Sequence, residues 1–405
     1  MKISAMSKPI TRLAIVAPFY RWWIKDLVNA LASSIYIIGV IVPYNPIIEF
    51  VRLLPLDFVR DKKIYTKPKL IDTGNKPSNV YPVLISQPYI KPYRVNARLP
   101  HKLAERLTYY VEKIKPMIIH GHTIHPIGIA SVEVATRLNV PVVLTIHGAL
   151  EIAKGWLSDE IRHYVKYALK YSDIITTVSY RNKEIIEKIW SIPSKKILVI
   201  PNGFDDNIFK YIPKEHARKK LGLPTDKRIL INIGNLVPEK GQKYLIEAFA
   251  NVRKERDDVL LIIIGSGRLE VFLRKQIKKL GLERSVFIVG HRPHNEIPLW
   301  MNAADFLVIT SITEGNPAVL FEALGVGLPV IATRVGGIPE IIISDEYGLL
   351  CNPKDIVCLT ENILNAIDKE KEYNREKIAI YARRYSWSNI AKEYIKIYER
   401  VLRDR

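Results

Sequence analysis

The chain has 405 residues, of which 48% are hydrophobic and 25% are charged, and its formal net charge is +20 at pH 7. This composition is that of an ordinary globular protein, long enough for two domains. Its two cysteines, Cys351 and Cys358, exclude a disulfide-stabilised fold and fit a reducing compartment, where we expect two buried apolar thiols and no metal site.

The beginning of the chain shows neither a signal peptide nor a membrane span. Residues 1–10 lack a long apolar core followed by a small-residue cleavage site. The apolar stretch 27–42 is too short to cross a bilayer and contains Asn29, Ser33 and Ser34. We therefore expect a cytoplasmic protein.

The positive charge lies mainly in the first half. Residues 1–205 carry 29 Lys and Arg against 15 Asp and Glu, and the remaining residues carry 32 against 26. Residues 51–116 mix cations with aromatic side chains, which favours peripheral contact with an anionic membrane at the inner face of the plasma membrane. A core helix with a solvated loop is the alternative, and a thermophile's ion pairs would also explain the charge. No motif for nucleic-acid binding is present, so we expect no such partner.

Apolar runs alternate with amphipathic stretches through the first half. Strands are expected at residues 13–17, 35–42, 117–120, 142–146, 174–178 and 197–200. Helices are expected at residues 22–33 and 128–138, over a long stretch that ends at Ser172, and at 182–190. Strands separated by helices imply a parallel, doubly wound sheet, in which ligands bind at the carboxyl ends of the strands.

The second half repeats this alternation. Strands are expected at residues 229–233, 259–264, 286–289, 306–309 and 329–332. Helices are expected at residues 242–253 and 270–280, from Ala318 onward, after Gly336-Gly337, and at 387–402. The chain therefore predicts a second open sheet, and the natural architecture is two similar domains with a crevice between them.

The chemistry is concentrated between Ile309 and Ile341, where Glu314 precedes a helix and Glu322 lies within its first turns. The backbone N–H groups at the start of that helix suit a phosphate, and carboxylates accept hydrogen bonds from sugar hydroxyls. The plainer alternative is that Glu314 complements the helix dipole and that Glu322 is solvated. The flanking Gly-Asn-Pro and the strand–loop–helix setting favour a functional site.

This segment resembles the Glu-x7-Glu motif of the retaining glycosyltransferases of family 4, which have the two-domain GT-B fold. Gly234 to Gly241, GNLVPEKG, is similar to the G-R-L-x-x-x-K-G segment of that family, and Gly265-Ser266-Gly267 is similar to its G-x-G. As a dinucleotide fingerprint, Gly265-Ser266-Gly267 is incomplete. The His147-Gly148 pair, the H-x-H spacing of His120 and His122, and Pro201-Asn202-Gly203 resemble the family as well.

The resemblance implies a role for each matching residue. Glu322 would hold the ribose of a nucleotide sugar, Glu314 and His147 would contact the donor sugar, and Lys240 would contact the diphosphate. The remaining donor-binding positions would be Gly234, Asn235, Gly315, Asn316, Pro317, Ala318 and Val319. No cofactor and no metal are expected, because leaving-group charge is met by backbone N–H groups and basic side chains. The spacing of His120, His122 and His125 offers a weaker metal hypothesis, without a nearby carboxylate.

Two positions depart from the family pattern. Asn235 stands where the family has an arginine, so one of the two usual leaving-group cations is absent. The loop after the first strand, Pro18 to Trp23, contains no glycine, whereas the family usually has a glycine pair there. Its aromatic residues would either line an acceptor pocket or open when a ligand binds.

We therefore predict an α/β protein of the GT-B fold, with two Rossmann-like doubly wound domains facing across a cleft. The N-terminal acceptor domain is expected at residues 1–205, a linker at 206–222, the nucleotide-sugar domain at 223–384, and a helix that crosses back at 385–405. The expected function is retaining transfer of a sugar from a UDP- or GDP-type donor to a glycan or lipid-linked acceptor. A sugar-nucleotide epimerase of the same architecture and a non-catalytic polyanion-binding protein are the alternatives; a dinucleotide-dependent oxidoreductase lacks its fingerprint.

Overall fold

The computed structural model describes residues 9–20, 22–46, 70–87, 98–153 and 158–405. The chain forms two compact units: Met1–Pro201 together with Trp387–Arg405, and Asn202–Ser386. Residues 206–222, expected as a separate linker, belong to the second unit, where they include helix α9 (Lys214–Leu221). Much of the basic segment, residues 51–69 and 88–97, lies outside the described residues.

The first unit is built on a seven-stranded parallel sheet in the order β3-β2-β1-β4-β5-β6-β7. The chain first builds outward on one side of β1 and then continues on the other side, so the order reverses between β1 and β4. The strands are β1 (Arg12–Val16), β2 (Ile37–Tyr44), β3 (Val80–Ser86), β4 (Ile118–His122), β5 (Val142–Ile146), β6 (Ile174–Thr177) and β7 (Ile197–Val199).

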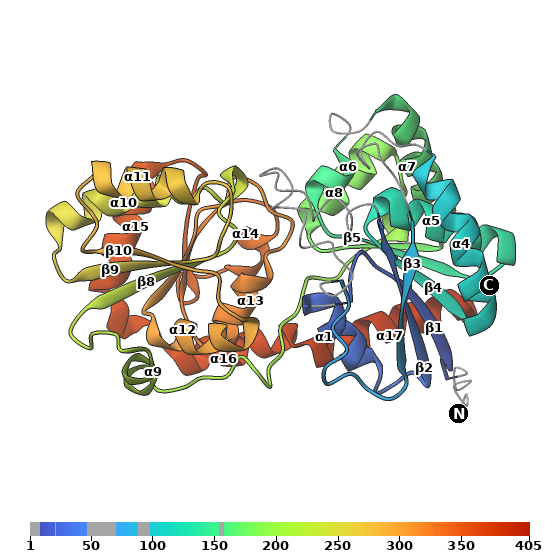
Figure 1. Ribbon diagram of the computed structural model, residues 1–405, viewed down its shortest axis with the longest axis horizontal. Coiled ribbons are helices and arrows are strands. Elements are labelled where there is room, and N and C mark those ends of the chain that lie inside the picture. Colours follow the sequence, from blue (N-terminus) through green and yellow to red (C-terminus); the bar gives the residue numbers. More distant parts are fainter. Residues whose placement is uncertain (1–8, 21, 47–69, 88–97, 154–157) are drawn as a thin grey trace. The chain divides into compact units, whose positions relative to one another are not determined.

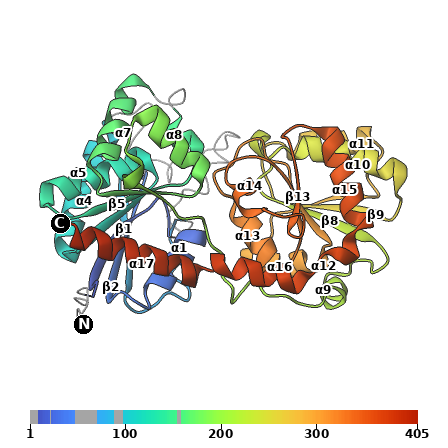
Figure 2. The same cartoon turned by 180° about the vertical axis from the view of Figure 1, so that it is seen from behind.

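Helices cover both faces of this sheet, each over its own apolar core (Figures 1 and 2). On one face, α1 (Trp22–Leu31) packs with the C-terminal helix α17 (Trp387–Arg403), which Figure 2 shows running along the sheet. The other face carries α4 (Leu99–Ile114), α5 (Ile129–Leu138), α7 (Asp159–Tyr171) and α8 (Tyr180–Trp190). Because both faces are buried, the central strands read as continuous apolar runs, as the sequence predicted.

The stretch expected as one long helix ending at Ser172 contains two helices, α6 (Ala149–Ile152) and α7. The cause is local. Ser158 has an extended backbone, and its hydroxyl oxygen accepts a hydrogen bond from the N–H of Ile161 at 3.4 Å, so a new helix begins there.

The described part of the basic segment contains strand β3 and helix α4, neither of which was predicted. The apolar side chains of α4, among them Leu103, Leu107 and Val111, pack into the core of the unit. The apolar face of α4 is therefore part of the core, while membrane contact for residues 51–116 as a whole stays a prediction. Among the described residues, no helix combines the length and the apolar character needed to cross a bilayer.

The second unit is built on a six-stranded parallel sheet in the order β10-β9-β8-β11-β12-β13, and here the order reverses between β8 and β11. Helices α10, α11 and α15 cover one face and α12, α13 and α16 the other (Figure 1). The strands are β8 (Arg228–Ile233), β9 (Val259–Ile264), β10 (Val286–Gly290), β11 (Phe306–Ile309), β12 (Val330–Thr333) and β13 (Gly348–Cys351). The helices are α10 (Gln242–Glu255), α11 (Glu270–Lys279), α12 (Ile297–Ala303), α13 (Ala318–Gly325), α14 (Ile338–Ile341), α15 (Ile356–Asp368) and α16 (Arg375–Ala382).

A buried ion network fastens α9 to this sheet. The Arg218 guanidinium, 1% exposed, donates to Asp305 Oδ2 at 2.7 Å and to four backbone carbonyls. Asp305 also accepts from Lys214 Nζ at 2.6 Å and from the N–H of Ile229 at 2.6 Å. A single carboxylate, directly before β11, therefore ties three segments of the unit together.

Candidate functional site

The predicted cation and one predicted carboxylate meet across the reversal point of the second sheet. Lys240 lies in the loop after β8, and Glu314 lies in the loop after β11. Lys240 Nζ is 2.5 Å from Glu314 Oε1, which also accepts from the hydroxyl of Ser311 at 2.6 Å. The side chains of Lys240 and Glu314 are 31% and 11% exposed, so both are ordered by contacts and reachable from solvent. Open α/β sheets bind ligands at this point of the topology.

Close backbone contacts hold these two loops together. The N–H of Ile312 donates to the carbonyl of Glu239 at 2.8 Å, and the hydroxyl of Thr310 donates to the carbonyl of Lys240 at 3.1 Å. Gly241 has a φ of +66°, and a Cβ there would lie 2.1 Å from the carbonyl oxygen of Thr310. Only glycine permits this approach, which fixes where the Lys240 side chain starts.

The loop that carries Glu314 is held from two further sides. The N–H of Gly337, in the loop after β12, donates to the carbonyl of Gly315 at 2.7 Å. The Asn202 side-chain amide donates to the carbonyl of Asn316 at 2.7 Å, which gives Pro201-Asn202-Gly203 a structural role. Helix α13 then begins at Ala318, with Pro317 as its N-cap residue. Its first N–H groups are therefore presented at the carboxyl edge of the sheet, as an anion requires.

Glu322 lies on α13, where its side chain is 13% exposed, and it has a partner that the sequence did not reveal. His294 Nε2 is 2.9 Å from Glu322 Oε1. His294 follows β10 in the short turn before α12, so the carboxyl end of a third strand contributes to the same edge. The sequence signal that could have found this partner is the position of His294 shortly after a predicted strand, at the edge where the other site residues lie.

The glycines after β9 allow their loop to pack closely against the loop after β8. Gly265 has a φ of +148°, and a Cβ there would lie 1.9 Å from the carbonyl oxygen of Gly234. A Cβ on Gly267 would lie 2.5 Å from the carbonyl oxygen of Leu236. These glycines therefore position the loop of Gly234 and Asn235, whose side chain is exposed.

The second unit thus gathers Lys240, Glu314, Glu322 and the 315–319 backbone, whereas His147 lies in the first unit, directly after β5. His147 Nε2 is 3.0 Å from His122 Nδ1, and the two rings stack. The Trp23 ring centroid is 4.2 Å from that of His147. Trp23, the last residue of the glycine-free stretch, lies in α1, and its ring therefore packs against the predicted site histidine.

Beneath this pair, His120 is fully buried in a polar cluster. Its Nδ1 is 2.7 Å from the hydroxyl of Tyr398 and its Nε2 is 2.6 Å from that of Thr145. Burial lowers the pKa of His120 and of His147 to about 3 and holds the pKa of His122 well below its usual range. All three rings are neutral at pH 7.

This cluster predicts acid sensitivity of the first unit. Below pH 6.5 the unfolded chain binds protons on these histidines and the folded chain does not, so stability is lost as pH falls from 6.5 towards the folded pKa values near 3. Each histidine contributes up to about 1.4 kcal/mol per pH unit to the loss. Urea unfolding followed by tryptophan fluorescence measures it, because the second unit contains only Trp300 among the six tryptophans.

His120→Asn is expected to reduce this pH slope, because the substituted side chain does not titrate. His163→Asn, at an exposed position on α7, is the matched control and is expected to keep the slope of the wild type. Equal slopes for the two variants would contradict the prediction.

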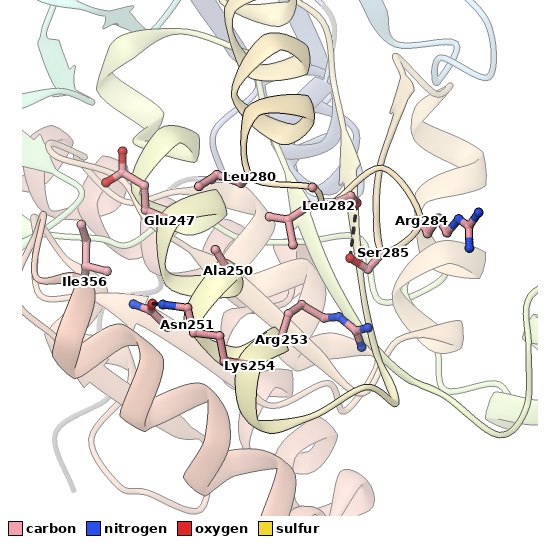
Figure 3. Close-up of a pocket in the computed structure, with 11 residues that line it drawn as sticks. Glu247, Ala250, Asn251, Arg253, Lys254, Leu280, Leu282, Arg284, Ser285 and Ile356 are labelled. Atoms are coloured by element: carbon pink, nitrogen blue, oxygen red, sulfur yellow. Dashed lines mark hydrogen bonds between the residues drawn. The ribbon is translucent and has the colours of Figure 1, made fainter.

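Among the described residues, no group of three or more His, Cys, Asp or Glu side chains is placed to hold a metal ion. A surface groove of about 650 Å³ lies in the second unit between α10 and the turn that joins α11 to β10 (Figure 3). Arg253, Lys254 and Arg284 are among the residues that line it, and it contains none of the predicted site residues.

Comparison with known proteins identifies the family. Residues 213–385 match the model of glycosyl transferases group 1, and residues 67–208 match that of glycosyltransferase family 4. An uncharacterized glycosyltransferase of Methanocaldococcus jannaschii is 31% identical over 307 residues, which are 71% of this chain and 76% of that protein. The N-acetyl-alpha-D-glucosaminyl L-malate synthase of Bacillus anthracis is 26% identical over 340 residues, 81% of this chain and 87% of that protein.

The fold has solved counterparts. The structure of Anabaena HepE in complex with UDP superposes with a TM-score of 0.72 at 19% identity, covering 96% of this chain and 99% of that one. At this identity the likeness shows the fold, and the family models and relatives show the family. The chain has the GT-B fold and belongs to the glycosyl transferases of group 1.

Proposed function

We propose that this glycosyltransferase moves a sugar from a nucleotide sugar, of the UDP or GDP type, to a glycan or lipid-linked acceptor with retention of configuration. The observation that carries the proposal is the Lys240–Glu314 pair across the reversal point of the second sheet, with Glu322 on the helix that follows. Structures of similar fold with bound UDP, UDP-glucose and ADP support a nucleotide-sugar donor.

The chemistry of each group suggests its role. Glu322 offers a carboxylate to the two ribose hydroxyls, with His294 holding one of its oxygens. Glu314 offers its carboxylate to hydroxyls of the donor sugar. The first N–H groups of α13 and the ammonium of Lys240 offer positive charge to the diphosphate.

The Lys240–Glu314 pair also suggests how the site changes on binding. Without a donor, each charge is neutralised by the other at 2.5 Å. A diphosphate competes for the lysine, while sugar hydroxyls compete for the carboxylate. Lys240 would then stabilise the charge that develops on the leaving diphosphate, and the acceptor would attack on the same face as the departing group, which retains configuration.

Thermal stability against UDP-, GDP- and ADP-sugars tests the donor site. We expect one nucleotide class to raise the Tm of the wild type and to have little effect on Glu322→Ala. The lost ribose contacts are worth about 1–3 kcal/mol, or roughly 5- to 150-fold in Kd. Glu361→Ala, on an exposed part of α15, is the control and is expected to keep the shift.

No Tm shift of the wild type with any nucleotide sugar would overturn the proposal. Turnover of the donor sugar to its epimer without an acceptor would establish the epimerase alternative. Retention of the full shift by Glu322→Ala would remove Glu322 from the donor site while leaving the transferase assignment in place.

A further inference from the structure

We propose that Glu151 is a positioning residue of the first unit, whose carboxylate fixes the loops after β4 and β5 and thereby sets the place of His147. This inference rests on the proposed function, together with the contact to the donor sugar that the family resemblance implies for His147. Glu151 itself contacts neither donor nor acceptor in this proposal and acts through the backbone that it holds.

The Glu151 side chain is bonded entirely to backbone N–H groups. Its Oε1 accepts from the N–H of His147 at 3.1 Å and from that of Gly148 at 2.9 Å. Its Oε2 accepts from the N–H of Ile124 at 2.9 Å. One oxygen therefore serves the loop after β5 and the other serves the loop after β4.

The loop after β4 needs such support because its backbone is strained. Thr123 has φ +68° and ψ 157°, a combination that is essentially restricted to glycine and costs about 1–3 kcal/mol for other residues. Its N–H donates to the carbonyl of Thr145 at 2.9 Å, and the next N–H, that of Ile124, is the one bound by Glu151. A Cβ on Gly128 would lie 2.5 Å from the Thr123 carbonyl oxygen, so the turn is closed from that side as well.

The two loops lie at the edge of the first sheet where a ligand is expected to bind. Strand β4 borders the reversal point of the first sheet, and β5 is its neighbour, so both loops lie where ligands of such sheets bind. The pinned backbone carries His147, whose ring stacks on that of His122. Strained backbone that is held by neighbouring contacts is typical of ligand sites.

A carboxylate at position 151 can accept hydrogen bonds from both loops at once. Three N–H dipoles point at a carboxylate that is only partly exposed. Burial raises the pKa of Glu151 to about 7, although the hydrogen bonds from Ile124, Gly148 and His147 favour the ionised form. An amide in its place would point an NH2 group at one of the two loops, because an amide has a single acceptor oxygen.

The test compares Glu151→Gln with Glu133→Gln. Glu133 is a carboxylate on α5 of the same unit, 15% exposed and paired with His101 and Arg137. We expect Glu151→Gln to lower kcat for sugar transfer at least 10-fold, where kcat is calculated from the concentration of protein that binds nucleotide. The Kd of the nucleotide is expected to stay within twofold of the wild type. Glu133→Gln is expected to keep kcat within twofold.

If Glu151→Gln does not fold, as judged by circular dichroism, Glu151→Asp replaces it. This shorter carboxylate keeps the charge but reaches only one loop, and the same loss of kcat is expected. A kcat within twofold of that of Glu133→Gln, in whichever Glu151 variant folds, would overturn the inference. A wild type that binds no nucleotide sugar would refute the proposed function instead, and so the two failures are distinguishable.

Discussion

Replacing Lys240 by alanine is expected to lower kcat for sugar transfer by about 100- to 1,000-fold, the loss typical when one group that stabilises developing charge is removed. The site offers few substitutes. Asn235 stands where the family has an arginine, and its exposed side chain carries no charge. Lys240, which Glu314 holds at the edge where the diphosphate is proposed to lie, is therefore the family cation that this chain retains.

Steady-state kinetics with the donor found by the nucleotide screen measure this effect. Lys243→Ala is the matched control, because Lys243 lies at the start of α10, over the ring of Tyr244, outside the loops of the site. It is expected to keep kcat within twofold. A Lys240→Ala enzyme with kcat within threefold of the wild type would show that the helix N-terminus alone supports the leaving group.

The candidate site of the second unit was largely predictable from the sequence for a topological reason. Loops that follow parallel strands all emerge at one edge of the sheet, so Lys240, Glu314 and Glu322 had to lie near one another once their strands were assigned. Their pairing was not predictable. The 2.5 Å Lys240–Glu314 contact depends on Gly241 approaching Thr310, and the His294–Glu322 contact depends on where β10 ends.

The first unit was less predictable, because its decisive contacts leave little trace in the sequence. Strand β3 lies at the edge of the sheet and contains Pro82, so it lacks the long apolar run that marked the central strands. The positive φ of Thr123 falls on a residue that rarely adopts it. In the sequence, Glu151 looks like an ordinary acidic residue in the first turn of a helix. Only the folded chain shows that its carboxylate binds two loops.

Asp305→Ala is expected to destabilise the second unit by about 3–5 kcal/mol, the cost of leaving a buried charge without its partner. The Arg218 guanidinium, 1% exposed, would keep its carbonyl contacts but lose the carboxylate at 2.7 Å. Although burial alone would raise the pKa of Asp305, Arg218 and Lys214 hold it below its usual value. The contribution of this carboxylate is therefore present above the pKa of an unfolded aspartate, near 4, and is lost as pH falls through the lower folded value.

Urea unfolding at pH 7, followed by circular dichroism, measures the loss, with Asp258→Ala as the control. Asp258 also pairs with an arginine, Arg256, at 3.0 Å, but the two side chains are 32% and 31% exposed. Exposed pairs contribute about 0–1 kcal/mol, so the control should unfold close to the wild type. Equal losses of stability in the two variants would contradict the prediction that burial makes the Asp305 network the more costly one to break. The larger loss at Asp305 is expected because the charge left on Arg218 cannot be resolvated while α9 stays packed on the sheet.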